Sequence, residues 1–273
     1  MIVEKKHNLW KYIVGLVLCI IYLIPLYVLS VISFKPMEDT SSYWVFSKTP
    51  TLENLSLAFI RGDILSALLN TLLITVASVF LIVLVGSLTA YPLARKKTKL
   101  TSLIRNFSLG IMMVPPLTIL VPLYATLVSY HGVNTYWGLV ITLLTFELPL
   151  SIFLYTNFIK AIPVALDEAA EIDGAGPIRT FYQIILPQLK SVTVSVVILS
   201  GIHCWNDYQF SLYIMQKKAL RTVTLAIASF FSQDSSNLNA AAAGALIVIL
   251  PVILIFIFLQ KYFIKGMVDS AIK

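Results

Sequence analysis

Six apolar runs, separated by shorter polar intervals, organise the chain. They cover about residues 12–34, 64–94, 106–130, 136–158, 191–215 and 240–260. Each run is long enough to cross the hydrocarbon core of a bilayer, which takes roughly 20 helical residues. The pattern predicts an all-α integral membrane protein, with six transmembrane helices in a single transmembrane domain spanning residues 1–273.

Two of these runs leave alternatives open. Residues 12–34 could form a cleavable signal peptide, but its apolar region would be shorter and a small-x-small cleavage site would follow, so we expect a retained first span. The third run contains Pro115, Pro116 and Pro122, which should kink its helix. That kink fits a bent helix in the protein core or a helix that lines a water-filled path.

The polar interval at residues 160–190 predicts two short helices joined by a turn. Pro163 suits a first helical turn, and Asp167 and Glu168 are favourable near the positive end of the helix dipole. Gly174 is expected to stop this helix.

The second short helix should begin at Gly176-Pro177 and end at Pro187. Ile178, Phe181 and Ile185 fall about one turn apart and predict its apolar stripe. Two such helices could instead lie on the lipid surface. However, surface helices usually have a basic polar face, and this segment is acidic.

Composition supports the membrane assignment. The 273 residues are 58% hydrophobic and 12% charged, with a mean hydropathy of +0.88. A net charge of +7 could indicate nucleic-acid binding, but the cations lie between apolar runs and form no basic face, so we expect no nucleic-acid partner. Fourteen of the 20 Lys and Arg residues fall on the side of both termini and the 160–190 loop. We therefore expect a multi-pass protein of the cell (inner or plasma) membrane, with both termini and this loop in the cytoplasm.

Ionisable side chains inside apolar runs are costly and therefore indicate function. Glu147 lies in the fourth run, and His203, Asn206 and Asp207 in the fifth are spaced i, i+3 and i+4, which predicts one helical face. The flanking aromatic residues are Trp205 and Tyr208. These residues could line a sugar pathway, form a water-exposed cluster at the outer end, or make structural hydrogen bonds between helices. A proton relay through Glu147, His203 and Asp207 is a further reading.

A nucleotide or metal site is not predicted in the chain. The phosphate-binding loop G-x-x-x-x-G-K-[ST] needs a Gly-Lys pair, which this sequence lacks. If ATP drives transport, the nucleotide and Mg²⁺ bind to a separate ATPase subunit. The three histidines are far apart and show no metal-ligand spacing, so we expect neither a metal centre nor a catalytic residue.

The 160–190 loop resembles the EAA motif of binding-protein-dependent ABC importer permeases. The motif reads E-A-A, three residues, G, nine residues, I-x-L-P, and the matching residues here are Glu168, Ala169, Ala170, Gly174, Ile184, Leu186 and Pro187. The resemblance implies a coupling loop that docks on an ATPase, with Asp167 and Asp173 as further contacts.

Other segments are similar to the MalG-type permease subunits of carbohydrate-uptake ABC importers. They are Asn70 in L-L-N-T, the segment A-Y-P-L-A-R that ends at Arg95, the segment W-N-D-Y at 205–208, and Gly266-Met267. Ser191 departs from the family pattern, in which many relatives have a second Pro there.

That resemblance implies half of a sugar-translocation pathway. The partners would be a homologous second (MalF-like) permease, two ATPase subunits and an extracytoplasmic sugar-binding protein, which residues 216–239 could approach. The competing classes are an ion- or proton-coupled secondary transporter and, more weakly, a membrane-anchored assembly protein. A secondary transporter would need an internal repeat, which this chain lacks.

Overall fold

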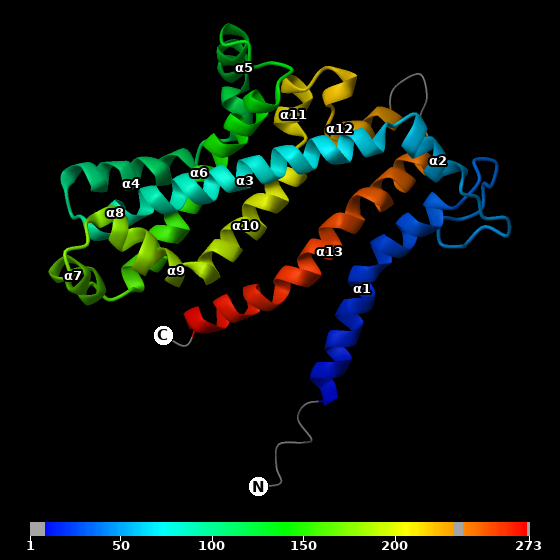
Figure 1. Cartoon of the computed structure of the whole chain (residues 1–273). Coiled ribbons are helices and arrows are strands. Elements are labelled where there is room, and N and C mark those ends of the chain that lie inside the picture. Colours follow the sequence, from blue (N-terminus) through cyan, green and yellow to red (C-terminus); the bar gives the residue numbers. More distant parts are fainter. Residues whose placement is uncertain (1–8, 232–236, 272–273) are drawn as a thin grey trace. The chain divides into compact units, whose positions relative to one another are not determined.

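The computed structural model describes residues 9–231 and 237–271, which form helices and connecting segments without a strand. Four helices contain a stretch that is long and apolar enough to cross a membrane: α1 (Leu9–Ser33), α3 (Ile64–Arg95), α6 (Tyr136–Ala161) and α13 (Leu238–Ala271). Two bent helix pairs bring the number to six if each pair counts as one span. Figure 1 shows these helices along the chain and confirms the predicted all-α class for the described residues.

The third predicted span, residues 106–130, is not one helix. Helix α4 (Lys99–Ile111) starts earlier, and a 99° bend separates it from η1 (Pro116–Ile119) and α5 (Leu120–Ser129). The break falls just before Pro116, because Pro115 and Pro116 cannot donate backbone hydrogen bonds to the preceding turn. Pro122 causes no break, since it lies in the first turn of α5, where its missing N–H is not needed.

The fifth predicted span, residues 191–215, is also divided. Helix α10 covers Lys190–Trp205, and α11 covers Gln209–Ile214 after three non-helical residues. A 77° bend separates α10 from the short helices that precede it: α8 (Pro177–Thr180), the π-turn η2 (Phe181–Ile185) and α9 (Leu186–Gln188).

The chain divides into two compact units, of which one contains residues 1–65 and 226–250. Helices α1 and α2 (Glu53–Ile60) and the start of α13 belong to it. The buried Lys35 ammonium donates to the carbonyls of Ser41 (2.8 Å) and Ser42 (3.0 Å). The amides of Asn54 and Asn239 donate to the Lys35 carbonyl, both at 2.8 Å. One buried residue thus organises the loop after α1.

The adjoining Asp39 is held in its charged form. Hydrogen bonds from the Ser41 and Ser47 side chains lower the pKa of Asp39 to about 2, because they favour the ionised carboxylate. Its carboxylate also accepts from the Ser41 backbone N–H at 2.9 Å.

The other unit contains residues 66–225 and 251–273, and it holds both predicted site regions. Helix α6 packs against α3, α4 and α10. A side chain at Gly86 of α3 would overlap Ser151 of α6, whose hydroxyl donates to the Ile82 carbonyl at 3.2 Å. Small residues therefore let these two helices approach closely.

The connection after α11 is tied down inside this unit. It contains η3 (Lys218–Leu220) and leads into α12 (Val223–Ala228) and η4 (Ser229–Phe231). Asn70 donates to the carbonyls of Ala219 and Arg221, both at 3.0 Å, and accepts from the Tyr136 hydroxyl at 2.7 Å. Part of the predicted 216–239 segment, residues 232–236, lies outside the described residues.

Candidate functional site

The acidic loop begins with helix α7 (Ala165–Ile172), which has Asp167 and Glu168 in its first turn. Gly174 has a φ of +76°, a left-handed conformation that glycine adopts without steric cost. The Ala175 N–H then donates to the Ala170 carbonyl at 2.8 Å and closes the end of the helix. The predicted helix, with its stop at Gly174, is therefore present.

The second half of the loop differs from its prediction. Phe181 and Ile185 are buried, but Ile178, in the first turn of α8, is 75% exposed, and residues Phe181–Ile185 form a π-turn rather than a regular α-helix. Pro187 does not end the helical segment either. It lies in the first turn of α9, where no N–H is needed, and the bend follows at Leu189.

Asp167 points back into the chain rather than toward solvent. Its carboxylate forms an ion pair with the Arg95 guanidinium (Nη2–Oδ2 2.8 Å) and accepts from the Tyr91 hydroxyl (Oη–Oδ1 2.6 Å). The same guanidinium donates from Nη1 to the carbonyls of Ile159 (3.1 Å) and Ile162 (3.0 Å). Arg95 thus joins the end of α3 to the end of α6 and the start of α7.

The junction formed by Tyr91, Arg95 and Asp167 is shielded from water, which strengthens its ion pair. The side chains of Arg95 and Asp167 are only 11% and 16% exposed. A cation at the carbonyl end of α6 is also favoured by the helix dipole. The Tyr91 ring lies 5.5 Å from the Phe181 ring, so α3 contacts both halves of the loop. The loop is therefore anchored at two points on α3.

The remaining residues of the predicted docking set divide between surface and interior. Glu168, Ala169, Asp173, Gly174 and Pro187 are exposed, Ile184 and Leu186 are half-buried, and Ala170 is buried. The acidic groups open to another subunit are Glu168, Glu171 and Asp173. Any contribution of Asp167 to docking is indirect, through the position of α7.

The polar residues of the fifth run do not share one helical face. Helix α10 ends at Trp205, and the Asp207 carboxylate accepts from the backbone N–H groups of Phe210 (3.3 Å) and Ser211 (2.8 Å) and from the Ser211 hydroxyl (2.6 Å). It acts as a cap at the start of α11. The single-face prediction is wrong because this local hydrogen bonding competes with continuation of the helix.

The predicted pathway residues therefore diverge. His203 Nδ1 lies 3.0 Å from Glu147 Oε1, with side chains 56% and 15% exposed. Trp205 is buried, whereas Tyr208 and Asn206 are exposed, and the Asn206 amide donates to the Ile202 carbonyl. The structure thus brings together only Glu147 and His203 of the six predicted residues.

Sequence reasoning missed the contact of Tyr91 and Arg95 with the loop. Both residues were named only as parts of the family-like segment A-Y-P-L-A-R, and no spacing relates Arg95 to Asp167, 72 positions later. One signal was present: Arg95 follows directly on an apolar span, so its side chain is placed near the ends of the neighbouring helices.

Comparison with known proteins gives the family. Residues 82–269 match the family described as "Binding-protein-dependent transport system inner membrane component". The melibiose/raffinose/stachyose import permease protein MelC of Bacillus subtilis is 40% identical over 98% of each chain. AmyC of Thermoanaerobacterium thermosulfurigenes, a probable starch degradation products transport system permease, is 34% identical over 98% of this chain and 99% of its own. MsmG of Streptococcus mutans, a multiple sugar-binding transport system permease, is 32% identical over 99% of each.

Solved structures agree in fold. A bacterial ABC transporter involved in the import of the acidic polysaccharide alginate superposes with a TM-score of 0.75 at 18% identity, covering 95% of this chain and 98% of the other. The MetNI methionine ABC transporter superposes with a TM-score of 0.60 at 16% identity, over 78% and 98% of the two chains. Together with the family match and the full-length relatives, this shows that the chain is a multi-pass membrane protein and belongs to the family of binding-protein-dependent transport system inner membrane components, as the sequence resemblance predicted.

Proposed function

We propose that this chain is a permease subunit of an ATP-driven, binding-protein-dependent sugar importer. The support is the family, together with relatives similar over their full length whose names specify sugars: melibiose, raffinose and stachyose for one, and starch degradation products for another. Oligosaccharides related to melibiose and raffinose are therefore the first substrates to test.

The proposed complex contains a homologous second permease, two ATPase subunits and an extracytoplasmic sugar-binding protein. Each permease contributes half of the pathway, and the ATPases bind ATP and Mg²⁺. This sequence lacks the Gly-Lys pair of a phosphate-binding loop, so in this proposal ATP is bound by another chain.

In this proposal both termini and the α7–α9 loop lie in the cytoplasm, at the inner or plasma membrane. The 2.8 Å contact between Arg95 and Asp167 supports one part of it, because two side chains that touch at the ends of spans lie on the same side of the bilayer. The cluster of Lys96, Lys97 and Lys99 directly after Arg95 then favours the cytoplasm for that side.

The single observation that best supports a coupling role is the junction of Arg95, Tyr91 and Asp167. It attaches α7, whose exposed side has Glu168 and Glu171, to the ends of α3 and α6. When the ATPases close on ATP, they would draw the loops of the two permeases together. The movement would pass through this junction into α3 and α6, and through Leu189 into α10, opening the cavity outward.

The relatives and the family match give no support to an ion- or proton-coupled secondary transporter. The geometry weakens the proton relay as well. Glu147 and His203 are in contact, but the Asp207 carboxylate is occupied by three hydrogen bonds at the start of α11.

The test is reconstitution of the chain with its companion subunits in proteoliposomes. ATP-dependent uptake of labelled raffinose should require the binding protein and survive a protonophore. Gly174→Asp and Glu168→Lys should abolish uptake and ATPase stimulation while the protein stays in the membrane. Uptake that persists without ATP and collapses with the protonophore would refute the proposal.

A further inference from the structure

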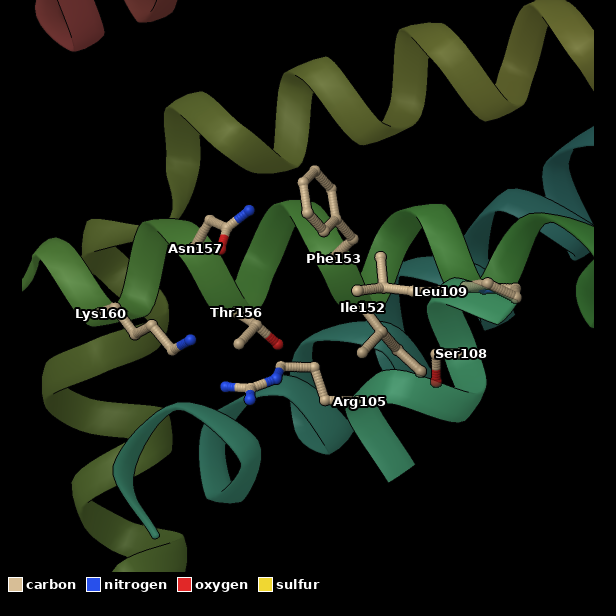
Figure 2. A pocket seen from close by; sticks show the side chains of 9 residues that line it. Arg105, Ser108, Leu109, Ile152, Phe153, Thr156, Asn157 and Lys160 are labelled. Atoms are coloured by element: carbon tan, nitrogen blue, oxygen red, sulfur yellow. The ribbon is translucent and has the colours of Figure 1, made fainter. Parts of the chain in front are cut away.

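A groove with no assigned role lies between α4 and α6 (Figure 2). Its volume is about 240 Å³, and its walls include Arg105 and Leu109 from α4 and Ile152, Phe153, Thr156 and Lys160 from α6. It is separate from the Arg95–Asp167 junction and from the Glu147–His203 pair, none of whose residues lines it.

One end of the groove suits an anion. In Figure 2 the side chains of Arg105, Thr156 and Lys160 point into the same space. Within residues 9–231 and 237–271, the side chains of Arg105 and Lys160 have no ion pair or hydrogen bond, and no carboxylate lines the groove. The Thr156 hydroxyl is buried without a hydrogen-bond partner, in a residue only 2% exposed. A buried hydroxyl without a partner is costly, and because its oxygen is closed off from solvent, a ligand oxygen would satisfy it only after a small movement of the groove wall.

The other end is apolar. Ile152 is buried, while Leu109 and Phe153 are 40% and 41% exposed. The groove therefore combines two unpaired cations and a free hydroxyl with an aliphatic and aromatic wall. A molecule that has a phosphate at one end and a hydrocarbon chain at the other matches both parts.

Helix α4 itself indicates where such a molecule would come from. Its 13 residues are too few to span a bilayer, and none of them is buried. Leu100, Leu103 and Phe107 are 65%, 65% and 68% exposed, and Lys97 and Lys99 lie at its start. An apolar stripe with neighbouring cations is typical of a helix at the lipid headgroup level. Basic pockets between helices on the cytoplasmic side are suited to anionic headgroups.

We propose that the α4–α6 groove binds an anionic phospholipid of the cytoplasmic leaflet. The phosphate would lie between Arg105 and Lys160 and accept a hydrogen bond from the Thr156 hydroxyl, and an acyl chain would cover Leu109, Ile152 and Phe153. Lys160 is in the last turn of α6, next to the Ile159 carbonyl that Arg95 binds. The lipid would therefore brace the bent α4–α5 pair against the helix that holds the coupling loop. The choice of leaflet rests on the orientation given under the proposed function.

The experiment is native mass spectrometry of the purified importer complex, delipidated and then titrated with phosphatidylglycerol or phosphatidylcholine of matched acyl chains. The wild-type complex should retain phosphatidylglycerol in preference to phosphatidylcholine. The Arg105→Gln/Lys160→Gln variant should bind phosphatidylglycerol about 25-fold more weakly, at roughly fivefold per cation. Thr156→Val should weaken it by about tenfold or more through loss of one hydrogen bond to a charged group.

The matched control is Lys97→Gln/Lys99→Gln, which removes the same charge outside the groove and should keep tight binding. Equal loss in the groove variant and the control would overturn the proposal, because it would show surface attraction only. Equal retention of phosphatidylcholine would overturn it too, as would displacement of the lipid by millimolar inorganic phosphate, which would indicate a soluble anion. If the groove variant does not assemble, the Arg105→Lys/Lys160→Arg variant is measured in its place. This variant keeps both charges and should keep the lipid. Loss of the lipid from it would contradict the account.

These readouts are independent of sugar transport. A complex that retains the lipid but shows no ATP-driven uptake would refute the proposed function and leave the lipid site standing. Normal uptake, combined with the same lipid loss in the groove variant and the control, would refute the lipid site alone.

Discussion

Two acid–base pairs connect distant segments of residues 66–225, and they are built differently. The Arg95–Asp167 pair is almost enclosed, at 11% and 16% exposure, and its guanidinium and carboxylate both have additional partners. The Glu147–His203 pair has one contact, and its histidine is 56% exposed.

The difference indicates two kinds of role. An enclosed, multiply bonded pair fixes the elements that it joins, because breaking it leaves a charge without compensation. A single contact made through a histidine that is 56% exposed can exchange that histidine for a ligand, although Glu147 itself is only 15% exposed. We therefore expect the first pair to transmit force and the second to contact substrate.

The largest effect is expected from breaking the enclosed pair. Asp167→Asn or Arg95→Gln should lower the free energy of unfolding by about 3 kcal/mol, because one charge stays nearly buried and unpaired. Sugar-stimulated ATPase activity should be lost with it. Thermal unfolding of the purified complex gives the first quantity. The double variant should be more stable than the sum of the single effects predicts, and strict additivity would argue against direct coupling.

The next largest effect should arise at the turn between the two loop helices. Gly174→Val should cost about 1–2 kcal/mol, because a β-branched residue is strained at a φ of +76°. Gly174→Asn is the matched control and should cost less, since asparagine tolerates this conformation. Both variants are compared by unfolding and by co-purification of the ATPase. Identical behaviour would mean that the backbone conformation of Gly174 is not what matters.

A smaller effect should separate two adjacent residues of the fifth run. Asp207→Ala removes the cap of α11 and should cost about 1 kcal/mol. Asn206→Ala, at an exposed residue that bonds only to its own helix, should stay within about 0.5 kcal/mol. Unfolding midpoints in denaturant measure both. A larger effect at Asn206 would contradict the assignment of Asp207 as the cap.

The smallest effect on stability is expected for the Glu147–His203 pair. Glu147→Gln and His203→Gln should each change the free energy of unfolding by less than about 1 kcal/mol, because a glutamine amide can replace the single hydrogen bond of this pair. In proteoliposomes they should raise the KM for sugar while uptake stays dependent on ATP. Uptake driven by a proton gradient would favour the relay instead. The same holds if the wild type shows proton-driven uptake and the two variants lose it.

Helix positions in this chain were predictable where hydrophobicity alone decides them. The spans 64–94 and 136–158 agree with α3 and α6 within about three residues, because apolar length sets where a helix can lie in a bilayer. Pro92 and Pro149 stay inside helices, while Pro115 and Pro116 mark a break, so proline by itself does not decide the outcome.

The site was predictable as a segment but not as a set of contacts. The acidic helix and the Gly174 turn follow from local propensity, whereas the Arg95–Asp167 pair depends on tertiary packing of residues far apart in sequence. Asp207 shows the same limit on a shorter scale. Its spacing from His203 fits one continuous helix, but its side chain instead caps the next helix, α11.

The central claim is that the exposed side of α7 meets an ATPase subunit in the cytoplasm. Its direct test starts from a cysteine-free chain with Cys19→Ser and Cys204→Ser. Glu168→Cys then gives the test protein, and Tyr130→Cys, at the end of α5, gives a separate control for the opposite side. An impermeant maleimide should label the Glu168→Cys protein in inverted vesicles stripped of the ATPase but not in right-side-out vesicles, and the control should show the reverse. A short bifunctional reagent should then cross-link the Glu168→Cys protein to the co-purifying ATPase. Labelling from outside the cell, or cross-linking to no ATPase, would contradict the account.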